Sequence, residues 1–286
     1  MIQQIQGLSE LSGRYDALLC DVWGVIHNGR EAFPGPCSAL ARWREKLGPV
    51  VLISNSPRPS PEVAAQLDGF GAPRRAWSGL VTSGDVTRIL LAERAPGPAY
   101  RLGPERDGPL YAGLPLRFAG LDEAKFISCT GPVDDETETP ETYRPMFLEA
   151  AARGLPMICA NPDKVVQRGD RLIFCGGALA ELYAALGGPV IMAGKPHAPI
   201  YEAALTEAAG LLGAPLDPAR VLAIGDGIAT DVAGANRQGL DVLFVAGGIH
   251  RAETHGLNGR LNPRATEDLL AAAGGQAAYV MEELAW

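Results

Sequence analysis

Ala17-Leu18-Leu19-Cys20-Asp21-Val22-Trp23-Gly24-Val25 is the stretch of sequence that decides the fold. Its first four residues form a short apolar run, which is typical of a buried strand in a parallel sheet. Such a strand places the Asp21 carboxylate at its C-terminal end, the edge at which open α/β sheets bind ligands. Asp21 is therefore the first candidate functional residue, and Trp23 is the second feature that needs an explanation.

Further strands and helices are predicted along the chain. Apolar runs occur at residues 50–53, 221–224 and 242–245, and helix-like segments occur at residues 37–47, 62–70, 200–212 and 230–238. Their alternation predicts βαβ units, and hence an α/β fold with a Rossmann-like, doubly wound parallel sheet. Polar clusters follow two of these runs, Ser54-Asn55-Ser56 and Gly225-Asp226-Gly227. Lys195 is expected at the end of another strand.

The middle of the chain has a different pattern. Pro96-Gly97-Pro98 marks a break, and short strands are predicted after it at residues 100–102, 126–129 and 157–159. We therefore expect residues 1–85 and 190–286 to form one discontinuous core, with an α/β domain inserted over residues 86–189. The acidic residues 134–138 predict a solvated loop, and Thr139-Pro140 after them predicts a helix start.

Composition limits the classes of function. The net charge of −8 over 286 residues argues against nucleic acid or an anionic membrane as the main partner. The five cysteines include no C-x-x-C pair, so we expect buried thiols and neither a disulfide framework nor a zinc site. The first residues lack the pattern of a signal peptide, and no apolar stretch reaches membrane-spanning length. A cytoplasmic enzyme is expected.

Two phosphate-binding motifs are excluded by single residues. Gly194-Lys195-Pro196 is like the end of a P-loop, but that motif requires Ser or Thr after the lysine. The segment from Gly225 to Thr230 almost matches the dinucleotide fingerprint, but its third glycine is missing. Asp226 in this loop would also repel a pyrophosphate unless a cation lay between them.

Taken together, the polar strand ends indicate phosphoryl transfer. Asp21 and Asp226 would bring carboxylates together, an arrangement that favours a hard cation such as Mg²⁺. Ser54 offers a hydroxyl and Lys195 a positive charge, and both suit phosphate oxygens. Each residue taken singly has a structural explanation, since Asp and Ser often cap helices. The ordered set instead predicts transfer of a phosphoryl group to a carboxylate nucleophile.

The set resembles the four motifs of the haloacid dehalogenase superfamily, specifically the class IIA branch, which includes nucleotide, sugar-phosphate and p-nitrophenyl phosphatases. The resemblance extends from Leu18 to Gly248. It includes, in order, Asp21-Val22-Trp23-Gly24-Val25, His27-Asn28-Gly29, Phe33-Pro34-Gly35, Ile53-Ser54-Asn55-Ser56, Thr82-Ser83-Gly84-Asp85, Asn161-Pro162-Asp163, Gly194-Lys195-Pro196 and Gly225-Asp226-Gly227-Ile228-Ala229-Thr230-Asp231. It implies a Rossmann-like core with an α/β cap between the second and third motifs.

The resemblance also implies roles for individual residues. Asp21 corresponds to the nucleophile, and Ser54 and Lys195 correspond to the phosphate-binding hydroxyl and lysine. The implied Mg²⁺ ligands are Asp21, the carbonyl of Trp23, and Asp226, with Asp231 orienting metal-bound waters or the lysine.

Substrate contacts follow less directly from the resemblance. Asn55 is expected to shape the phosphate pocket. Asn161, in the cap, is a candidate substrate contact, although Asn161-Pro162-Asp163 is equally typical of a turn. The expected partner is a small phosphorylated metabolite, and a homodimer through the cap is implied.

Trp23 departs from the family pattern, because family phosphatases carry an aspartate there as general acid and base. An indole cannot do this work, which is typically worth ~10²–10⁴-fold in rate. Three functions remain open: a Mg²⁺-dependent phosphatase of low or leaving-group-sensitive activity, a phosphate-ligand binding protein without turnover, and a hydrolytic dehalogenase. Dehalogenases of the superfamily carry an aromatic residue at this position, but they place a helical cap between the first and second motifs.

Overall fold

The computed structural model describes residues 2–168, 171–256 and 258–286. The chain forms two compact units. The first consists of Met1–Ser54, Pro61–Val81 and Lys195–Trp286, and the second consists of Asn55–Ser60 and Thr82–Gly194. The predicted insertion over residues 86–189 lies within the longer segment of the second unit, and its role as a cap stays a prediction.

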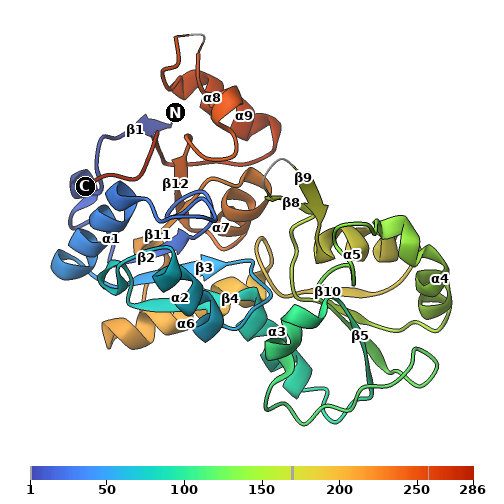
Figure 1. The fold of residues 1–286 in the computed structure, drawn as a ribbon. Coiled ribbons are helices and arrows are strands. Elements are labelled where there is room, and N and C mark those ends of the chain that lie inside the picture. The colour runs from blue at the N-terminus through green and yellow to red at the C-terminus, as the bar shows by residue number, and fades with distance from the viewer. Residues whose placement is uncertain (1, 169–170, 257) are drawn as a thin grey trace. The chain divides into compact units, whose positions relative to one another are not determined.

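The first unit is built on a seven-stranded sheet (Figure 1). In spatial order its strands are β1 (Gln3–Gln4), β13 (Tyr279–Met281), β12 (Asp241–Val245), β11 (Val221–Gly225), β2 (Ala17–Asp21), β3 (Val50–Ser54) and β4 (Gly79–Thr82). Neighbouring strands from β1 to β3 are parallel. The strand that carries Asp21 is central, with β11 on one side and β3 on the other.

The predicted strands of this sheet are all present. β2 is buried along its whole length, which explains why its sequence is a continuous apolar run and not an alternating one. Leu19 lies beside Ala223 of β11 and Val51 of β3, so apolar side chains meet across the three strands. β1, β4 and β13 were not predicted from the sequence.

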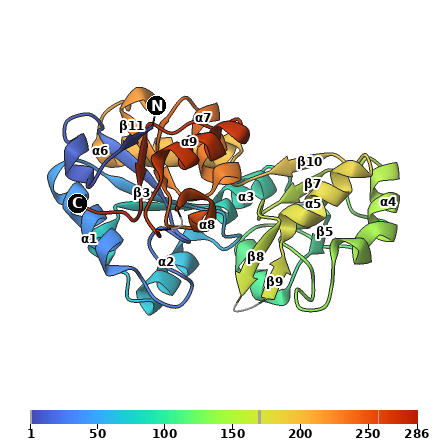
Figure 2. The same cartoon turned by 90° about the horizontal axis from the view of Figure 1, so that it is seen from above.

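Helices cover both faces of the sheet (Figure 2). α1 (Pro34–Lys46) and α2 (Ser60–Gly69) lie on one face, and α6 (Ala198–Leu212) and α7 (Ala233–Arg237) lie on the other. The chain moves outward from β2 to β3 in one direction and from β11 to β12 in the opposite one. Right-handed crossovers therefore place α1 and α7 on opposite faces. The predicted doubly wound sheet is confirmed.

The predicted helix over residues 230–238 is divided in two. A π-helical turn spans Ile228–Val232, and α7 begins only at Ala233. The wider turn coincides with Asp231, whose carboxylate accepts a hydrogen bond from the amide of Gly227 at 3.0 Å. Turns of this type occur frequently at functional sites.

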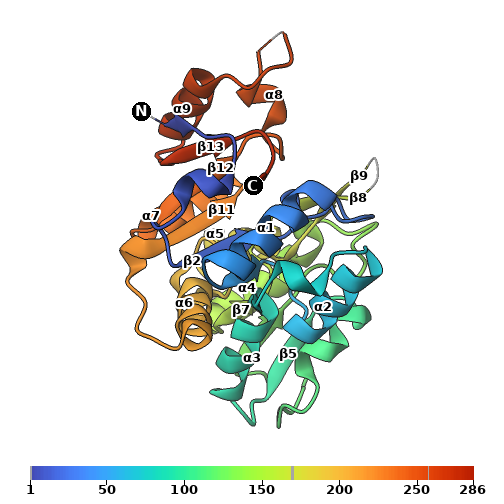
Figure 3. The same cartoon turned by 90° about the vertical axis from the view of Figure 1, so that its left-hand side faces the viewer.

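The first and last strands of the chain pair at one edge of the first unit's sheet (Figure 3). β1 pairs with β13, with Gln3 opposite Tyr279. The amide of Leu8 then donates to the carbonyl of Ala285 at 2.9 Å. α8 (Arg251–Thr254) and α9 (Pro263–Ala272) connect β12 to β13. Backbone hydrogen bonds therefore hold residues 3–8 against residues 278–285.

The second unit has its own parallel sheet and its own core. Its four strands lie in the order β10 (Val190–Met192), β7 (Met157–Cys159), β6 (Phe126–Cys129) and β5 (Ala99–Leu102). Its helices are α3 (Ser83–Ala92), α4 (Arg144–Ala152) and α5 (Gly176–Ala185), and β8 (Val165–Arg168) pairs antiparallel with β9 (Arg171–Phe174). The predicted helix start at Thr139-Pro140 is a 3-10 helix, Pro140–Tyr143, which leads into α4.

Two further sequence predictions concern the cysteines and the membrane. All five cysteines are buried free thiols, as predicted for Cys20, Cys129, Cys159 and Cys175. Among the described residues, none of the helices has the length and apolar character needed to cross a membrane.

Trp43 of α1 is the largest fully buried side chain of the first unit's core, and its indole N–H has no hydrogen-bond partner among the residues that the structure describes. We expect Trp43→Ala to lower the free energy of unfolding by about 3–5 kcal/mol through lost burial and a cavity. Trp43→Phe removes less volume and also removes the unsatisfied donor, so its cost should stay below about 2 kcal/mol. Urea unfolding of both variants checks this. An equal cost for the two would show that the indole N–H is satisfied in solution.

Candidate active site

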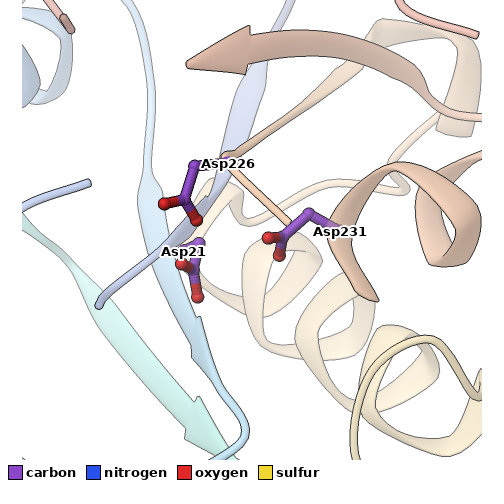
Figure 4. Close-up of side chains that lie close together, drawn as sticks. All are labelled: Asp21, Asp226 and Asp231. Carbon is purple, nitrogen blue, oxygen red and sulfur yellow. The ribbon is translucent and has the colours of Figure 1, made fainter. Parts of the chain in front are cut away.

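Three aspartates meet where the central strands of the first unit end (Figure 4). Asp21 is the last residue of β2, and Asp226 directly follows β11. Cys20 lies beside Ile224, so these parallel neighbours end together and bring both carboxylates to one edge. Asp231 enters from the π-helical turn. One carboxylate oxygen from each of the three lies within 4.8 Å of the others.

Lys195 provides the positive charge of this cluster. Its buried ammonium donates to Oδ1 of Asp21 and, at 2.7 Å, to Oδ1 of Asp231. The expectation that Lys195 ends a strand beside the others was wrong. The preceding strand, β10, belongs to the sheet of the second unit, and Lys195 is the first residue of the chain's return to the first unit. Lys195 thus joins the cluster from a turn that precedes α6.

Burial and mutual repulsion act on the carboxylates. Asp21, Asp226 and Asp231 are all less than a tenth exposed, and a single lysine neutralises only part of their charge. Burial, with Asp231 nearby, raises the pKa of Asp226 to about 6 and raises that of Asp21 well above its usual value. Burial opposes the charged form of Lys195, but the carboxylates of Asp21 and Asp231 outweigh it and raise the pKa of Lys195. The three carboxylates and one ammonium group therefore leave the site with an excess of negative charge.

The hydrogen bonds show which oxygens could bind a cation. Both oxygens of Asp231 are engaged, Oδ1 by Lys195 and Oδ2 by the amide of Gly227. Asp226 accepts at Oδ2 from the amide of Ile249 at 2.9 Å. Among the described residues, no other residue donates to Oδ2 of Asp21 or to Oδ1 of Asp226. No backbone amide of these residues donates to the carbonyl of Trp23 either. These three open oxygens form a donor set that fits a hard divalent cation.

Trp23 lies in a compact loop after Asp21. The amide of Gly24 donates to the carbonyl of His27 at 2.9 Å, and the amide of Ile26 donates to the carbonyl of Val22 at 3.0 Å. The Trp23 indole is half exposed. The next residue packs closely on the cluster, because a Cβ at Gly24 would overlap the carboxylate of Asp226. The backbone carbonyl of Trp23 and its indole side chain can therefore take part in different contacts.

The remaining predicted residues are placed as follows. Ser54 ends β3, whose residue Ile53 lies beside Asp21 in register. Asn55 and Asn161 belong to the second unit, where Asn55 donates to Oδ1 of Asp163 at 2.9 Å. Oδ1 of Asn161 accepts from the amide of Asp163 at 3.1 Å, which is the turn that the sequence also predicted. Their assignment to substrate binding stays a prediction.

The segment Gly248-Ile249 also contacts the cluster and was not predicted from the sequence. A Cβ at Gly248 would overlap the Asp226 carboxylate, and the Ile249 amide holds that carboxylate in place. The available signal was the pair of glycines after the strand at 242–245. No polar side chain drew attention to it, since the contact is made by backbone.

Comparisons with known proteins agree with this geometry. Residues 18–110 match the family described as haloacid dehalogenase-like hydrolase, and residues 192–282 match the family described as HAD-hydrolase-like. A crystal structure of a haloacid dehalogenase-like family hydrolase from Brucella suis is 46% identical, with a TM-score of 0.85, and covers 98% of this chain and 99% of that one. This chain belongs to the haloacid dehalogenase-like hydrolases. The family inferred from the motifs is confirmed.

Two further relatives carry functional names. Human chronophin is 28% identical over 267 residues, which are 86% of each chain. The glycerol phosphate phosphatase from Mycobacterium tuberculosis, solved in complex with calcium, is 26% identical, with a TM-score of 0.62. That match covers 85% of this chain and 69% of the other. The second relative shows a family member whose structure accepts a divalent cation.

Gly24 offers a test of the cluster's geometry, with Gly13 as a matched control. Both have positive φ, +86° and +78°, but a Cβ at Gly13 would meet open space. Alanine at either position should cost about 1–2 kcal/mol of backbone strain. Only Gly24→Ala should also displace Asp226 and weaken Mg²⁺ binding, by about tenfold or more. Urea unfolding and titration calorimetry measure the two effects. Equal Mg²⁺ affinity in both variants would contradict the close packing of Gly24 on Asp226.

Proposed function

We propose that this hydrolase is a phosphatase that cleaves a small phosphate monoester through an aspartyl-phosphate on Asp21, with Mg²⁺ as its metal. The observation that carries the proposal is the state of the Asp21 carboxylate. One of its oxygens is held by Lys195, and the other takes no hydrogen bond from the described residues. A carboxylate that is oriented yet has an open oxygen is suited to nucleophilic attack.

The proposed reaction has two steps. An oxygen of Asp21 attacks the phosphorus atom, and the bond to the ester oxygen breaks with its electron pair staying on that oxygen. Water then attacks the phosphorus of the aspartyl-phosphate, which releases inorganic phosphate and restores Asp21. The proton that the water loses balances the one that the departing oxygen takes up.

The other residues of the cluster support these steps. Lys195 offsets the negative charge that the phosphate brings to a site already rich in carboxylates. Asp231 holds Lys195, and its second oxygen is fixed by the amide of Gly227. Ser54, beside Asp21 at the sheet edge, is proposed to bind a phosphate oxygen. Mg²⁺ on Asp21, Asp226 and the Trp23 carbonyl would supply further positive charge for the phosphoryl group.

The relatives support the same class of reaction. The glycerol phosphate phosphatase is named for hydrolysis of a small phosphate ester. The free thiols fit the reducing cytoplasm that we propose as the setting. A dehalogenase is disfavoured, because the chain between Asp21 and Ser54 forms α1 and β3 and holds no helical cap domain. The homodimer stays a prediction.

A second candidate is a phosphate-ligand binding protein with little or no turnover. The observation in its favour is Trp23, which occupies the position of the expected acid and base and leaves the carboxylate cluster intact. The two candidates differ in whether any phosphate ester is hydrolysed.

The nucleophile is tested by Asp21→Asn, with Asp16→Asn as control. Asp16 lies just before the same strand, in an exposed ion pair with Arg220, and undergoes the same chemical change. Phosphate release from a panel of esters should fall at least about 10³-fold in Asp21→Asn and stay near wild type in Asp16→Asn. Chelation should abolish release, and Mg²⁺ should restore it. Wild-type turnover in Asp21→Asn would refute the assignment, and no release by the wild type from any ester would favour the binding protein.

Trp23→Asp tests the missing acid and base, with Trp23→Asn as its isosteric control. We expect kcat on alkyl phosphates to rise at least about tenfold in Trp23→Asp, because a carboxyl group can protonate a poor leaving group. Trp23→Asn removes the same bulk but cannot exchange a proton, so it should show no such gain. Equal rates in the two variants would contradict this explanation of Trp23.

A further inference from the structure

Large apolar side chains are exposed beside the carboxylate cluster. In the described part of the first unit, the strongly exposed ones are Trp23, Leu211 and Ile249, at 50, 42 and 65%. Trp23 is two residues from Asp21, and the amide of Ile249 donates to Asp226. Two of the three thus flank one small polar site, whereas Leu211 lies at the end of α6.

Trp23 and Ile249 border the same carboxylate. A Cβ at Gly24 or at Gly248 would overlap the side chain of Asp226, so the backbone of both segments packs closely on it. The neighbouring residues in the chain, Trp23 and Ile249, therefore lie at the margin of the cluster. An apolar margin around a charged centre is typical of sites that bind a ligand with one charged and one apolar end.

The indole of Trp23 is held in place. Its ring packs edge to face on His27, with centroids 5.2 Å apart, and lies against Gly29, where a Cβ would overlap it. His27 is buried and packs on Phe70, with ring centroids 5.0 Å apart. Its Nδ1 accepts from the amide of Gly29 at 2.8 Å. An exposed ring that is supported in this way offers a preorganised surface for another flat ring.

The chemistry at residue 23 favours the same kind of ligand. The indole of Trp23 supplies no proton to a leaving group, and the adjacent His27 is buried, with its Nδ1 already accepting from the amide of Gly29. A phenol leaves readily without protonation, because its usual pKa is about 10. An aliphatic alcohol is a far weaker acid and needs assistance.

We propose that the substrate of this site is an aryl phosphate monoester, with its aromatic ring stacked on the indole of Trp23 and flanked by Ile249. This inference rests on the phosphatase function proposed above. When the bond between phosphorus and the phenolic oxygen breaks, the electron pair leaves on that oxygen. The phenolate then takes up the proton that the hydrolytic water releases.

Binding of phosphonates tests ring recognition without turnover. Benzylphosphonate has the shape of phenyl phosphate, (cyclohexylmethyl)phosphonate replaces the flat ring with a saturated one, and methylphosphonate has no ring. With Mg²⁺ present, calorimetry should show benzylphosphonate binding about tenfold more tightly than methylphosphonate, and more tightly than the cyclohexyl compound. Trp23→Ala should reduce the tenfold ratio to below about threefold, and Ile249→Ala should reduce it less. Trp23→Phe should retain most of it.

Leu211→Ala is the matched control, since it removes a similarly exposed apolar side chain of the same unit and should leave the ratio unchanged. A wild-type ratio near one, a preference for the cyclohexyl compound, or an unchanged ratio in Trp23→Ala would each overturn the inference.

Phosphate release from phenyl phosphate, measured in wild type and Asp21→Asn, tests the underlying function separately. Release by the wild type together with a phosphonate ratio near one would refute ring recognition and leave the phosphatase standing. A high ratio without release from any ester would refute the phosphatase, and with it the substrate assignment.

Discussion

The ammonium group of Lys195, buried between the carboxylates of Asp21 and Asp231, is the interaction on which the rest of this site depends. Each partner comes from a different part of the chain: the end of a central strand, the start of the returning segment, and a π-helical turn. Removing one partner of a buried ion pair leaves an uncompensated charge, at a typical cost of about 3–5 kcal/mol. The same contacts that orient the proposed nucleophile therefore also fasten three segments of the first unit together.

The charge of this cluster has a second consequence. Three buried carboxylates face one lysine, so the folded chain carries a local excess of negative charge, which raises the pKa values of Asp21 and Asp226 and which a bound cation would offset. Trp23 fits this arrangement without contributing to it electrostatically. Its indole is half exposed, and its carbonyl accepts no backbone hydrogen bond from the described residues. A substitution at this side chain can therefore change the chemistry of the site and preserve the carbonyl that we propose as a metal ligand.

Much of this organisation was predictable from the sequence, and the reasons are specific. The apolar run before Asp21 and the one before Asp226 predict parallel strands, and parallel strands that are neighbours end at the same edge. Lys195 could not be placed in the same way, since its position depends on the path of the chain between two units. Ile249 was missed because a backbone amide has no signature in the sequence. The support of Trp23 by His27 was also invisible, as a histidine followed by Asn28 and Gly29 indicates a surface turn and not a buried ring.

The pairing of β2 with β11 also bears on how the chain folds. Cys20 and Ile224 are neighbours in the sheet, yet about two hundred residues separate them along the chain. During synthesis β2 and β3 emerge long before β11, whereas the strands of the second unit's sheet are close together in sequence. The second unit can therefore fold first. During that time β2, the apolar central strand of the first unit, lacks its neighbour β11. Contacts of such long range slow folding and prolong the exposure of strand edges. The segment that carries the proposed nucleophile thus keeps one unpaired edge until β11 has been synthesised.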